Sequence, residues 1–215
     1  MYGSFATGLW IRQSHVDLLL VRNDYETSGS STEILKKVAD ALKKSGHCKS
    51  VSLSSRNVRI PMIRADLFDS RHIRALNLTL MDPSNNGRAV ANFITEQKNN
   101  YPCLQPIFFT IKYLTSSYKL SEAKNGGLRT YALIIMLLSC MTKWNENNLG
   151  KFLIDFLYYF GFYYEYQYEM NTGVNMLGGR NPSLDFSDPL DSIDPYMMAL
   201  HIFDPLNKTN NVGKG

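Results

Sequence analysis

Two residues near the start of the chain, Gly3 and Ser4, could bind a phosphate group, and they are followed by a strand-like run that carries one carboxylate, Asp17. Glycine adopts backbone angles that other residues avoid, and the N–H groups of Gly3 and Ser4, with the Ser4 hydroxyl, can point at a phosphate. Asp17 is the only charge in the run VDLLLV, which alternates too little for a half-exposed strand and predicts a buried one. The stretch is either an ordinary turn into a core strand or a phosphate cradle beside an acidic strand.

Two side chains in the second half of the chain, Lys112 and Tyr131, could contact a nucleotide. Lys112 lies in the apolar run QPIFFTIKYL, where a lysine either extends its ammonium group to solvent along a buried stem or meets an anion. The Tyr131 ring could stack on a base, which contributes about 1–3 kcal/mol, or could pack in the core. The local sequence leaves both alternatives open for each residue.

The elements that must position these residues change character near Gly87. Hydrophobic periodicity predicts strands at 16–21, 51–53, 58–67 and 73–80, with one helix over 32–44 and a polar loop at 23–31. Beyond Gly87 it predicts helices over 88–98, 102–118, 128–141 and 149–161. The sequence therefore predicts an α+β protein with a mixed β-sheet and flanking helices over residues 1–95, followed by a mainly helical domain over residues 96–215.

Composition limits the class of protein. The 215 residues are 44% hydrophobic and 12% aromatic, enough for a sizeable core, and the net charge of +4 permits contact with a polyanion without requiring it. The three cysteines (Cys48, Cys103 and Cys140) lack metal-ligand spacing and predict buried, reduced thiols. The longest apolar run, 131–141, is too short to cross a bilayer, and the N-terminus has no signal-peptide layout. We expect an intracellular protein with no membrane contact.

Two conspicuous stretches have plain structural interpretations. The tyrosine-rich run LYYFGFYYEYQYE at 157–169 could stack on unpaired bases, but its alternation after Gly161 favours a helix end followed by a strand. The acidic run DFSDPLDSID at 185–194 contains a proline and lacks calcium-loop spacing, which favours a solvated loop.

The stretch YGSFATGLWIRQSHVDLLL resembles the signature of the DNA polymerase β-like nucleotidyltransferases, and the wording GSFATGL is most similar to poly(A) RNA polymerases of the nuclear-surveillance (TRAMP) type. That family has Asp-x-Asp where this chain has His15-Val16-Asp17. In IRALNLTLMD the family's third acidic position is occupied by Asn77. The resemblance implies a nucleotidyltransferase domain over 1–95, a PAP-associated domain over 96–215, and a nucleotide cleft between them. The family's strand before the Gly-Ser turn is expected to be missing.

The resemblance continues in the second half. The family's corresponding helix carries a lysine on phosphate, which implies that role for Lys112, and its Ser-Ser-Tyr nucleotide contact matches Arg129-Thr130-Tyr131. The C-terminal segment HIFDPLNKTNNVGKG is similar to the family's nucleotide-recognition motif at Asp204, Pro205, Asn210, Val212 and Gly213. Asparagine at position 210 goes with adenylate addition in that motif, which implies a preference for ATP.

The family adds AMP from ATP to RNA 3′ ends with two divalent ions, Mg²⁺ or Mn²⁺, held by three carboxylates. Here only Asp17 remains as a catalytic and metal-binding carboxylate. Replacing two charges by the neutral His15 and Asn77 removes attractions of about 4 kcal/mol per charge pair at an effective dielectric of about 20. We therefore expect poor metal binding. Imidazole could instead favour Zn²⁺, and the nearby acids Asp66, Asp69 and Asp82 could substitute, although solvated loop acids are the simpler interpretation.

Two functions from different classes follow. The first is an adenylyltransferase with impaired or lost activity, in which Gly3, Ser4, Lys112, Thr130, Tyr131 and Asn210 hold the nucleotide. The second is a pseudoenzyme that keeps nucleotide and RNA binding and serves as a scaffold in an RNA-processing complex. A deliberate change made to trap a substrate would explain Asn77 but not His15. By resemblance, the partners are an RNA 3′ end, a zinc-knuckle RNA-binding protein and an RNA helicase, and the location is the nucleus.

Overall fold

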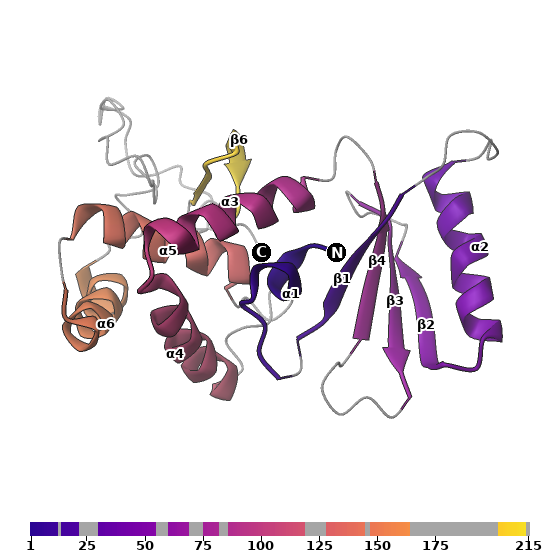
Figure 1. Cartoon of the computed structure of the whole chain (residues 1–215), viewed down its shortest axis with the longest axis horizontal. Helices are drawn as coiled ribbons and strands as arrows, with labels where there is room; N and C mark the ends of the chain where they lie inside the picture. Colours follow the sequence, from indigo (N-terminus) through magenta and orange to yellow (C-terminus); the bar gives the residue numbers. More distant parts are fainter. Residues whose placement is uncertain are drawn as a thin grey trace, which may run out of the picture. The chain divides into compact units, whose positions relative to one another are not determined.

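The computed structural model of the chain contains two compact units, Met1–Glu96 and Gln97–Gly215. It describes residues 1–12, 14–21, 30–54, 60–68, 75–81, 86–118, 128–144, 147–163 and 202–213. The α+β fold class is confirmed, with a mixed β-sheet in the first unit and mainly helices in the second (Figure 1). No helix among these residues is both long and apolar enough to span a membrane.

The first unit is built on a four-stranded sheet with the order β1-β4-β3-β2. The strands are β1 (Val16–Leu20), β2 (Cys48–Ser54), β3 (Met62–Leu67) and β4 (Ala75–Leu80). β1 and β4 are parallel, whereas β2, β3 and β4 are antiparallel neighbours, so the predicted mixed sheet is confirmed. A short helix, α1 (Gly3–Thr7), precedes the sheet and α3 (Gly87–Asn100) follows it.

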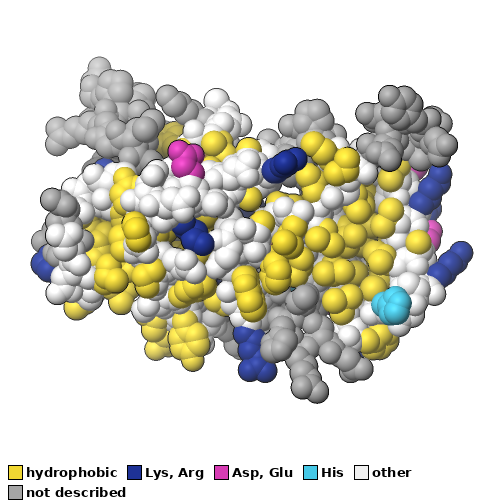
Figure 2. All heavy atoms as spheres, in the orientation of Figure 1, with side chains coloured by type: hydrophobic (Ala, Val, Ile, Leu, Met, Phe, Trp, Pro, Cys, Tyr) yellow, Lys and Arg dark blue, Asp and Glu magenta, His cyan; other side chains and the backbone are white. Residues whose placement is uncertain are grey.

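One face of the sheet is covered by α2 (Ser31–Lys44), as the periodicity predicts. A capping box fixes its start, because the Ser30 hydroxyl accepts from the Glu33 N–H and the Glu33 carboxylate accepts from the Ser30 N–H. The buried core between helix and sheet contains Leu35, Ala39, Ile63 and Leu78. The outer side of α2 carries exposed lysines, visible in Figure 2 at the end of the molecule where α2 lies.

The prediction that β1 is a fully buried strand is wrong. Only Val16 is buried, and the other four residues are half-buried. The reason is its position in the sheet: among the described residues, β1 is an edge strand that pairs along its length with β4, and its other side meets the isolated bridge from Tyr2 to Asp17. Leu18 and Leu20 of this run lie on the α2 side of the sheet and pack against the core.

Strand alternation gives the sheet a second, polar face. Successive side chains of a strand point to opposite faces, so the residues next to the core-facing Leu18, Ile63 and Leu78 project away from α2. The polar residues brought to that second face are Asp17 from β1, Asn77 from β4, Arg64 and Asp66 from β3, and Ser50 from β2. The candidate chemistry of the first unit lies here.

The second unit contains three predicted helices, all confirmed with shifts of a few residues: α4 (Leu104–Ser117), α5 (Thr130–Lys143) and α6 (Leu149–Tyr158). α5 is buried along Ala132–Cys140, so it is the central helix of the unit, and α4 packs against it. The chain closes with a hairpin of β5 (Phe203–Asp204) and β6 (Asn207–Asn211), which the sequence did not predict.

Two further sets of expectations concern the tyrosine-rich run and the cysteines. The tyrosine-rich run ends α6 and continues as a π-helical turn, Tyr159–Tyr163, while its expected strand and the acidic run at 185–194 lie outside the described residues. Cys48, Cys103 and Cys140 are free thiols. Only Cys140 is buried, so the prediction of three buried thiols is wrong for the other two. Cys48 stands on an edge strand and Cys103 at a helix start, where one side faces solvent.

Candidate functional site

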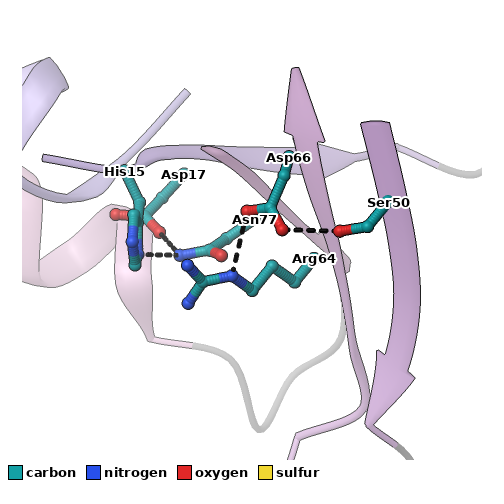
Figure 3. Close-up of polar contacts among 6 residues, drawn as sticks. All are labelled: His15, Asp17, Ser50, Arg64, Asp66 and Asn77. Atoms are coloured by element: carbon teal, nitrogen blue, oxygen red, sulfur yellow. Dashed lines mark hydrogen bonds and ion pairs between the residues drawn. The ribbon is translucent and has the colours of Figure 1, made fainter. Parts of the chain in front are cut away.

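The polar face of the sheet brings His15, Asp17 and Asn77 together (Figure 3). Asp17 and Asn77 are register partners of the parallel β1–β4 pair, and His15 stands two residues before Asp17, on the same side of the chain. Asn77 Nδ2 donates to Asp17 Oδ1 at 2.9 Å and lies 3.4 Å from His15 Nδ1. The positions that the resemblance assigns to three metal-binding acids are therefore adjacent in space.

Gly3 is pressed against this cluster. Its φ of +68° lies in the left-handed region, and a Cβ at this position would collide with Asp17 Oδ2. The backbone reinforces the approach, because the Tyr2 N–H donates to the Asp17 carbonyl oxygen at 3.0 Å. Only glycine satisfies both the backbone angle and the close contact. The Gly-Ser segment thus lies directly on the acidic strand, as the beginning of the short helix α1.

Burial shapes the electrostatics of the cluster. Desolvation raises the pKa of Asp17, and the hydrogen bond from Asn77 partly opposes that shift. A carboxylate accepts hydrogen bonds and cannot donate them, so it holds the Nδ2 side of the Asn77 amide toward itself. The other end of the amide, Asn77 Oδ1, is buried and has no hydrogen-bond partner among the described residues.

An ion pair lies beside the cluster on the same face. Arg64 and Asn77 are register partners of the β3–β4 pair, and the Arg64 side chain extends below Asn77 in Figure 3. Arg64 Nε lies 3.4 Å from Asp66 Oδ1, and the Ser50 hydroxyl donates to Asp66 Oδ2 at 2.5 Å. Asp66 therefore belongs to strand β3 and is held by two partners, which corrects its interpretation as a solvated loop acid. Asp69 and Asp82 lie outside the described residues.

The donor set does not fit a pair of Mg²⁺ or Mn²⁺ ions. These ions take hard, anionic oxygens, and the cluster offers one carboxylate, one imidazole and one amide. The amide turns its N–H toward Asp17 and His15, where a metal would need an oxygen lone pair. In the described part of the chain, no group of three or more His, Cys, Asp or Glu side chains could hold a metal ion.

The second unit has its own polar cluster, around Asp204. Its side chain is 1% exposed, and it accepts three hydrogen bonds. The Tyr131 hydroxyl and the Leu206 N–H both donate to Oδ1, at 2.8 and 2.9 Å, and Asn210 Nδ2 donates to Oδ2 at 3.0 Å. Two residues that the resemblance assigns to the nucleotide base, Tyr131 and Asn210, are therefore joined through one carboxylate.

Lys112 and Thr130 also lie in the second unit, on α4 and at the first position of α5. The Lys112 side chain is half-buried, and burial lowers the pKa of its ammonium group. Among the described residues, the Thr115 hydroxyl donates to the Lys112 backbone carbonyl, but none forms a hydrogen bond or ion pair with its ammonium group. A cation that loses hydration without gaining an anion is better suited to meeting an anionic ligand than to a structural ion pair.

Arg64 and Ser50 escaped prediction from sequence as site residues, and Asp204 entered only as part of the C-terminal motif that the resemblance identified. Arg64 could have been found from the alternation of MIRADL, which puts Ile63 and Ala65 in the core and Arg64 on the opposite face. Asp204 could have been found from the turn sequence Asp-Pro-Leu-Asn, because an aspartate before proline commonly accepts from the N–H two residues on. Neither pattern by itself reveals the hydrogen bonds to residues far along the chain.

Comparison with known proteins gives a consistent set of relatives. The Cryptococcus neoformans poly(A) RNA polymerase CID14 is 24% identical over the whole of this chain, and so is the Drosophila melanogaster inactive non-canonical poly(A) RNA polymerase protein Trf4-2. The fold is similar to that of the polymerase core of TRAMP, an RNA surveillance complex, with a TM-score of 0.72 and 20% identity. The matched region includes 99% of this chain and 66% of the TRAMP chain. The chain is a nucleotidyltransferase-fold homologue of the poly(A) RNA polymerases. No protein-family model matches it.

A further solved structure shares the fold of this poly(A) polymerase homologue. It is the Cid1 poly(U) polymerase with Mg²⁺ and 3′-dATP, with a TM-score of 0.72 and 16% identity. The matched region includes 99% of this chain and 73% of the Cid1 chain. The homologue spans 28% of the length of the Cryptococcus relative and 53% of the Drosophila one.

Proposed function

We propose that this poly(A) polymerase homologue binds a nucleotide, with ATP preferred, and has lost or nearly lost metal-dependent AMP transfer. Met1–Glu96 would be its nucleotidyltransferase domain and Gln97–Gly215 its PAP-associated domain. One observation carries the proposal: Asn77 Nδ2 donates to Asp17 Oδ1, so an amide N–H fills the space that metal-bound oxygens would need. The similarity to Trf4-2 supports it, since that relative is itself named an inactive poly(A) RNA polymerase protein.

The nucleotide-binding part of the proposal rests on residues that remain. Gly3 and Ser4 begin α1 beside Asp17 and offer backbone N–H groups and a hydroxyl. Lys112 is a half-buried cation without an anionic partner in the described chain, and it suits a triphosphate. In this proposal the nucleoside is bound by Thr130, Tyr131 and Asn210, and the Tyr131 ring stacks on the base. Mg²⁺ or Mn²⁺ could still arrive bound to the triphosphate.

The same residues suit a scaffold role. An RNA 3′ end is the polymer we propose for this homologue, and assembly with RNA-binding proteins is proposed because the TRAMP polymerase core shares its fold. A zinc-knuckle RNA-binding protein and an RNA helicase remain the proposed partners, and the nucleus the proposed location. A fully active adenylyltransferase is the competing function, and it would have to work with Asp17 as its single carboxylate.

Incorporation of labelled AMP on an oligo(A) primer tests the proposal, with Mg²⁺ or Mn²⁺, for the unmodified chain and for the His15→Asp, Asn77→Asp double variant. ATP binding is measured in parallel by calorimetry. We expect ATP binding by both proteins, no primer extension by the unmodified chain, and extension by the double variant if the rest of the site is intact. Robust extension by the unmodified chain would refute the loss of activity, and absence of ATP binding would refute nucleotide binding.

A further inference from the structure

Three side chains form a row across the polar face of the sheet: Asp17 on β1, Asn77 on β4 and Arg64 on β3. Strand register defines this row, since Asp17 pairs with Asn77 and Asn77 pairs with Arg64. Side chains of register partners lie on the same face of a sheet, one strand apart. The row therefore brings a guanidinium group next to positions that the resemblance assigns to metal-binding acids (Figure 3).

The guanidinium group of Arg64 is only partly engaged. Its contact with Asp66 joins Nε to Oδ1 at 3.4 Å, and neither of its two Nη groups forms a hydrogen bond with a described residue. The side chains of Arg64 and Asp66 are 36% and 37% exposed. An ion pair this long and this exposed contributes little to stability. The Nη groups are therefore available to a ligand that arrives from solvent.

A phosphate group is the ligand that this donor suits. A guanidinium group is planar, carries its charge at every working pH and presents parallel N–H groups that match two oxygens of one phosphate. Hydrogen bonds of this kind, between a charged donor and a charged acceptor, are stronger than those between neutral groups. Arg64 can therefore bind a phosphate while its Nε stays beside Asp66.

The two replacements that remove metal ligands also remove an obstacle to a phosphate chain without a metal. Three carboxylates at positions 15, 17 and 77 would repel anionic phosphates, and divalent ions offset such a repulsion. His15 and Asn77 carry no negative charge, and Asn77 donates a hydrogen bond to Asp17 Oδ1 at 2.9 Å. In the row, one carboxylate is now balanced by one guanidinium group. The face therefore has no need of a divalent ion to admit a phosphate.

We infer that the polar face binds the phosphate chain of the nucleotide without a divalent metal, and that the Arg64 guanidinium supplies the positive charge that metal ions supply in the family. The inference rests on the proposed nucleotide binding and deepens it, because it names free ATP rather than its Mg²⁺ complex as the ligand. Mg²⁺ and a guanidinium group both bind phosphate oxygens, so the ion competes with Arg64. A polymerase that requires metal has the opposite dependence.

Calorimetry in EDTA and in Mg²⁺ tests the inference by measuring the dissociation constant of ATP for the unmodified chain, for Arg64→Gln and for Lys43→Gln. Lys43 is the matched control: it lies on α2, which covers the opposite face of the sheet, and it contacts Asp40 at 3.5 Å much as Arg64 contacts Asp66. We expect the unmodified chain to bind ATP at least as tightly in EDTA as in Mg²⁺. In EDTA, Arg64→Gln should weaken binding at least about tenfold, and Lys43→Gln should change it less than about twofold.

The His15→Asp, Asn77→Asp double variant should show the opposite dependence on metal. Its three carboxylates repel free ATP, so Mg²⁺ should tighten ATP binding at least about tenfold relative to EDTA. Equal affinities of the double variant in EDTA and in Mg²⁺ would contradict the inference, because the two replacements would then have no influence on the ionic form that binds.

A measurement on the unmodified chain does not depend on a variant that folds. Titration with inorganic tripolyphosphate in EDTA should shift the Arg64 Nε–H signal in the ¹H–¹⁵N spectrum, since tripolyphosphate offers the phosphate chain without a nucleoside. A signal that stays in place would overturn the inference. A signal that moves with oligo(A) RNA and not with tripolyphosphate would also overturn it, in favour of an RNA contact.

The metal dependence separates this inference from the proposed function. Tighter binding of ATP in Mg²⁺ than in EDTA by the unmodified chain would overturn the inference and leave nucleotide binding standing. The same holds for an unchanged ATP affinity in an Arg64→Gln variant whose melting temperature shows that it is folded. Absence of ATP binding under both conditions would refute the inference and nucleotide binding together.

Discussion

Asn77 Nδ2 donates to Asp17 Oδ1 at 2.9 Å across the parallel pair of β1 and β4. This bond joins two positions that the family resemblance gives to metal-binding acids. Two carboxylates at these positions would repel each other, whereas the amide and the carboxylate attract each other. The candidate site of the first unit is therefore stable without a metal, and this independence can be measured apart from any activity.

The first prediction concerns metal-dependent stability. Restoring carboxylates by the His15→Asp, Asn77→Asp double change should lower the melting temperature in EDTA, because three carboxylates would then repel one another on one sheet face. Mg²⁺ or Mn²⁺ should raise the melting temperature of the double variant by several degrees and leave that of the unmodified chain unchanged. Differential scanning fluorimetry measures both. An equal response to Mg²⁺ in the two proteins would contradict the absence of a metal site.

The second prediction uses two glycines with nearly the same backbone angle. Gly3 has φ +68° and touches Asp17, whereas Gly46 has φ +72° with nothing within 4 Å of its would-be Cβ. Gly46→Ala should cost only the left-handed strain, about 1–2 kcal/mol in the free energy of unfolding. Gly3→Ala should cost clearly more, because its methyl group must also displace Asp17. Urea unfolding measures the difference. Equal decreases in the free energy of unfolding for the two variants would show that the contact between position 3 and Asp17 does not affect stability.

The third prediction is a pH dependence from Lys112. Burial lowers its pKa in the folded chain below the ordinary 10.5. The unfolded chain therefore binds the proton more tightly, and the free energy of unfolding should rise with pH between the folded and the unfolded pKa. Compared with Lys112→Met, the unmodified chain should be less stable at pH 7, and the difference should shrink as the pH rises toward 10.5.

The same pair of proteins separates a ligand contact from a snorkelling side chain. If the ammonium group meets a triphosphate, Lys112→Met should weaken ATP binding at least about tenfold while raising the melting temperature of the free protein. A variant that gains stability and keeps its ATP affinity would identify Lys112 as a structural residue.

The fourth prediction concerns the hydroxyl of Tyr131. Burial, together with Asp204, raises its pKa far above the ordinary value, so the hydroxyl stays protonated and donates at every working pH. Tyr131→Phe removes one of three donors to a buried carboxylate and should cost about 1–3 kcal/mol in the free energy of unfolding. Tyr113→Phe is the matched control, because Tyr113 is 73% exposed and its loss of a hydroxyl should cost almost nothing. Chemical denaturation compares the two.

Much of the fold could be predicted because its elements follow local rules. The apolar spacing of α2 and the alternation of β3 each point to one buried face, and the structure has both faces where the pattern puts them. The burial of β1 could not be predicted in this way. A strand of leucines has the same composition at the edge of a sheet and at its centre, and only the pairing order decides.

The candidate sites were predictable in part for the same reason. Asp17 could be located from the sequence of its strand. The roles of His15 and Asn77 came from the family resemblance, since no local pattern relates Asp17 and Asn77, which are 60 positions apart. The turn around Asp204 was not predicted, although the Asp-Pro sequence is typical of such a turn. The hydrogen bond that Asp204 accepts from Tyr131, 73 positions earlier, depends on the tertiary fold and could not be predicted from the local sequence.

The cluster on β1 and β4 also has a genetic meaning. Codons for aspartate, asparagine and histidine differ only in their first base, so each departure from the acidic pattern is one base change away from an acid. The buried Asn77 Oδ1, which no described residue satisfies, lowers stability where an apolar side chain would not. Asn77 is thus a single base change from the aspartate that the family resemblance expects at this position, and its amide is not explained by packing alone.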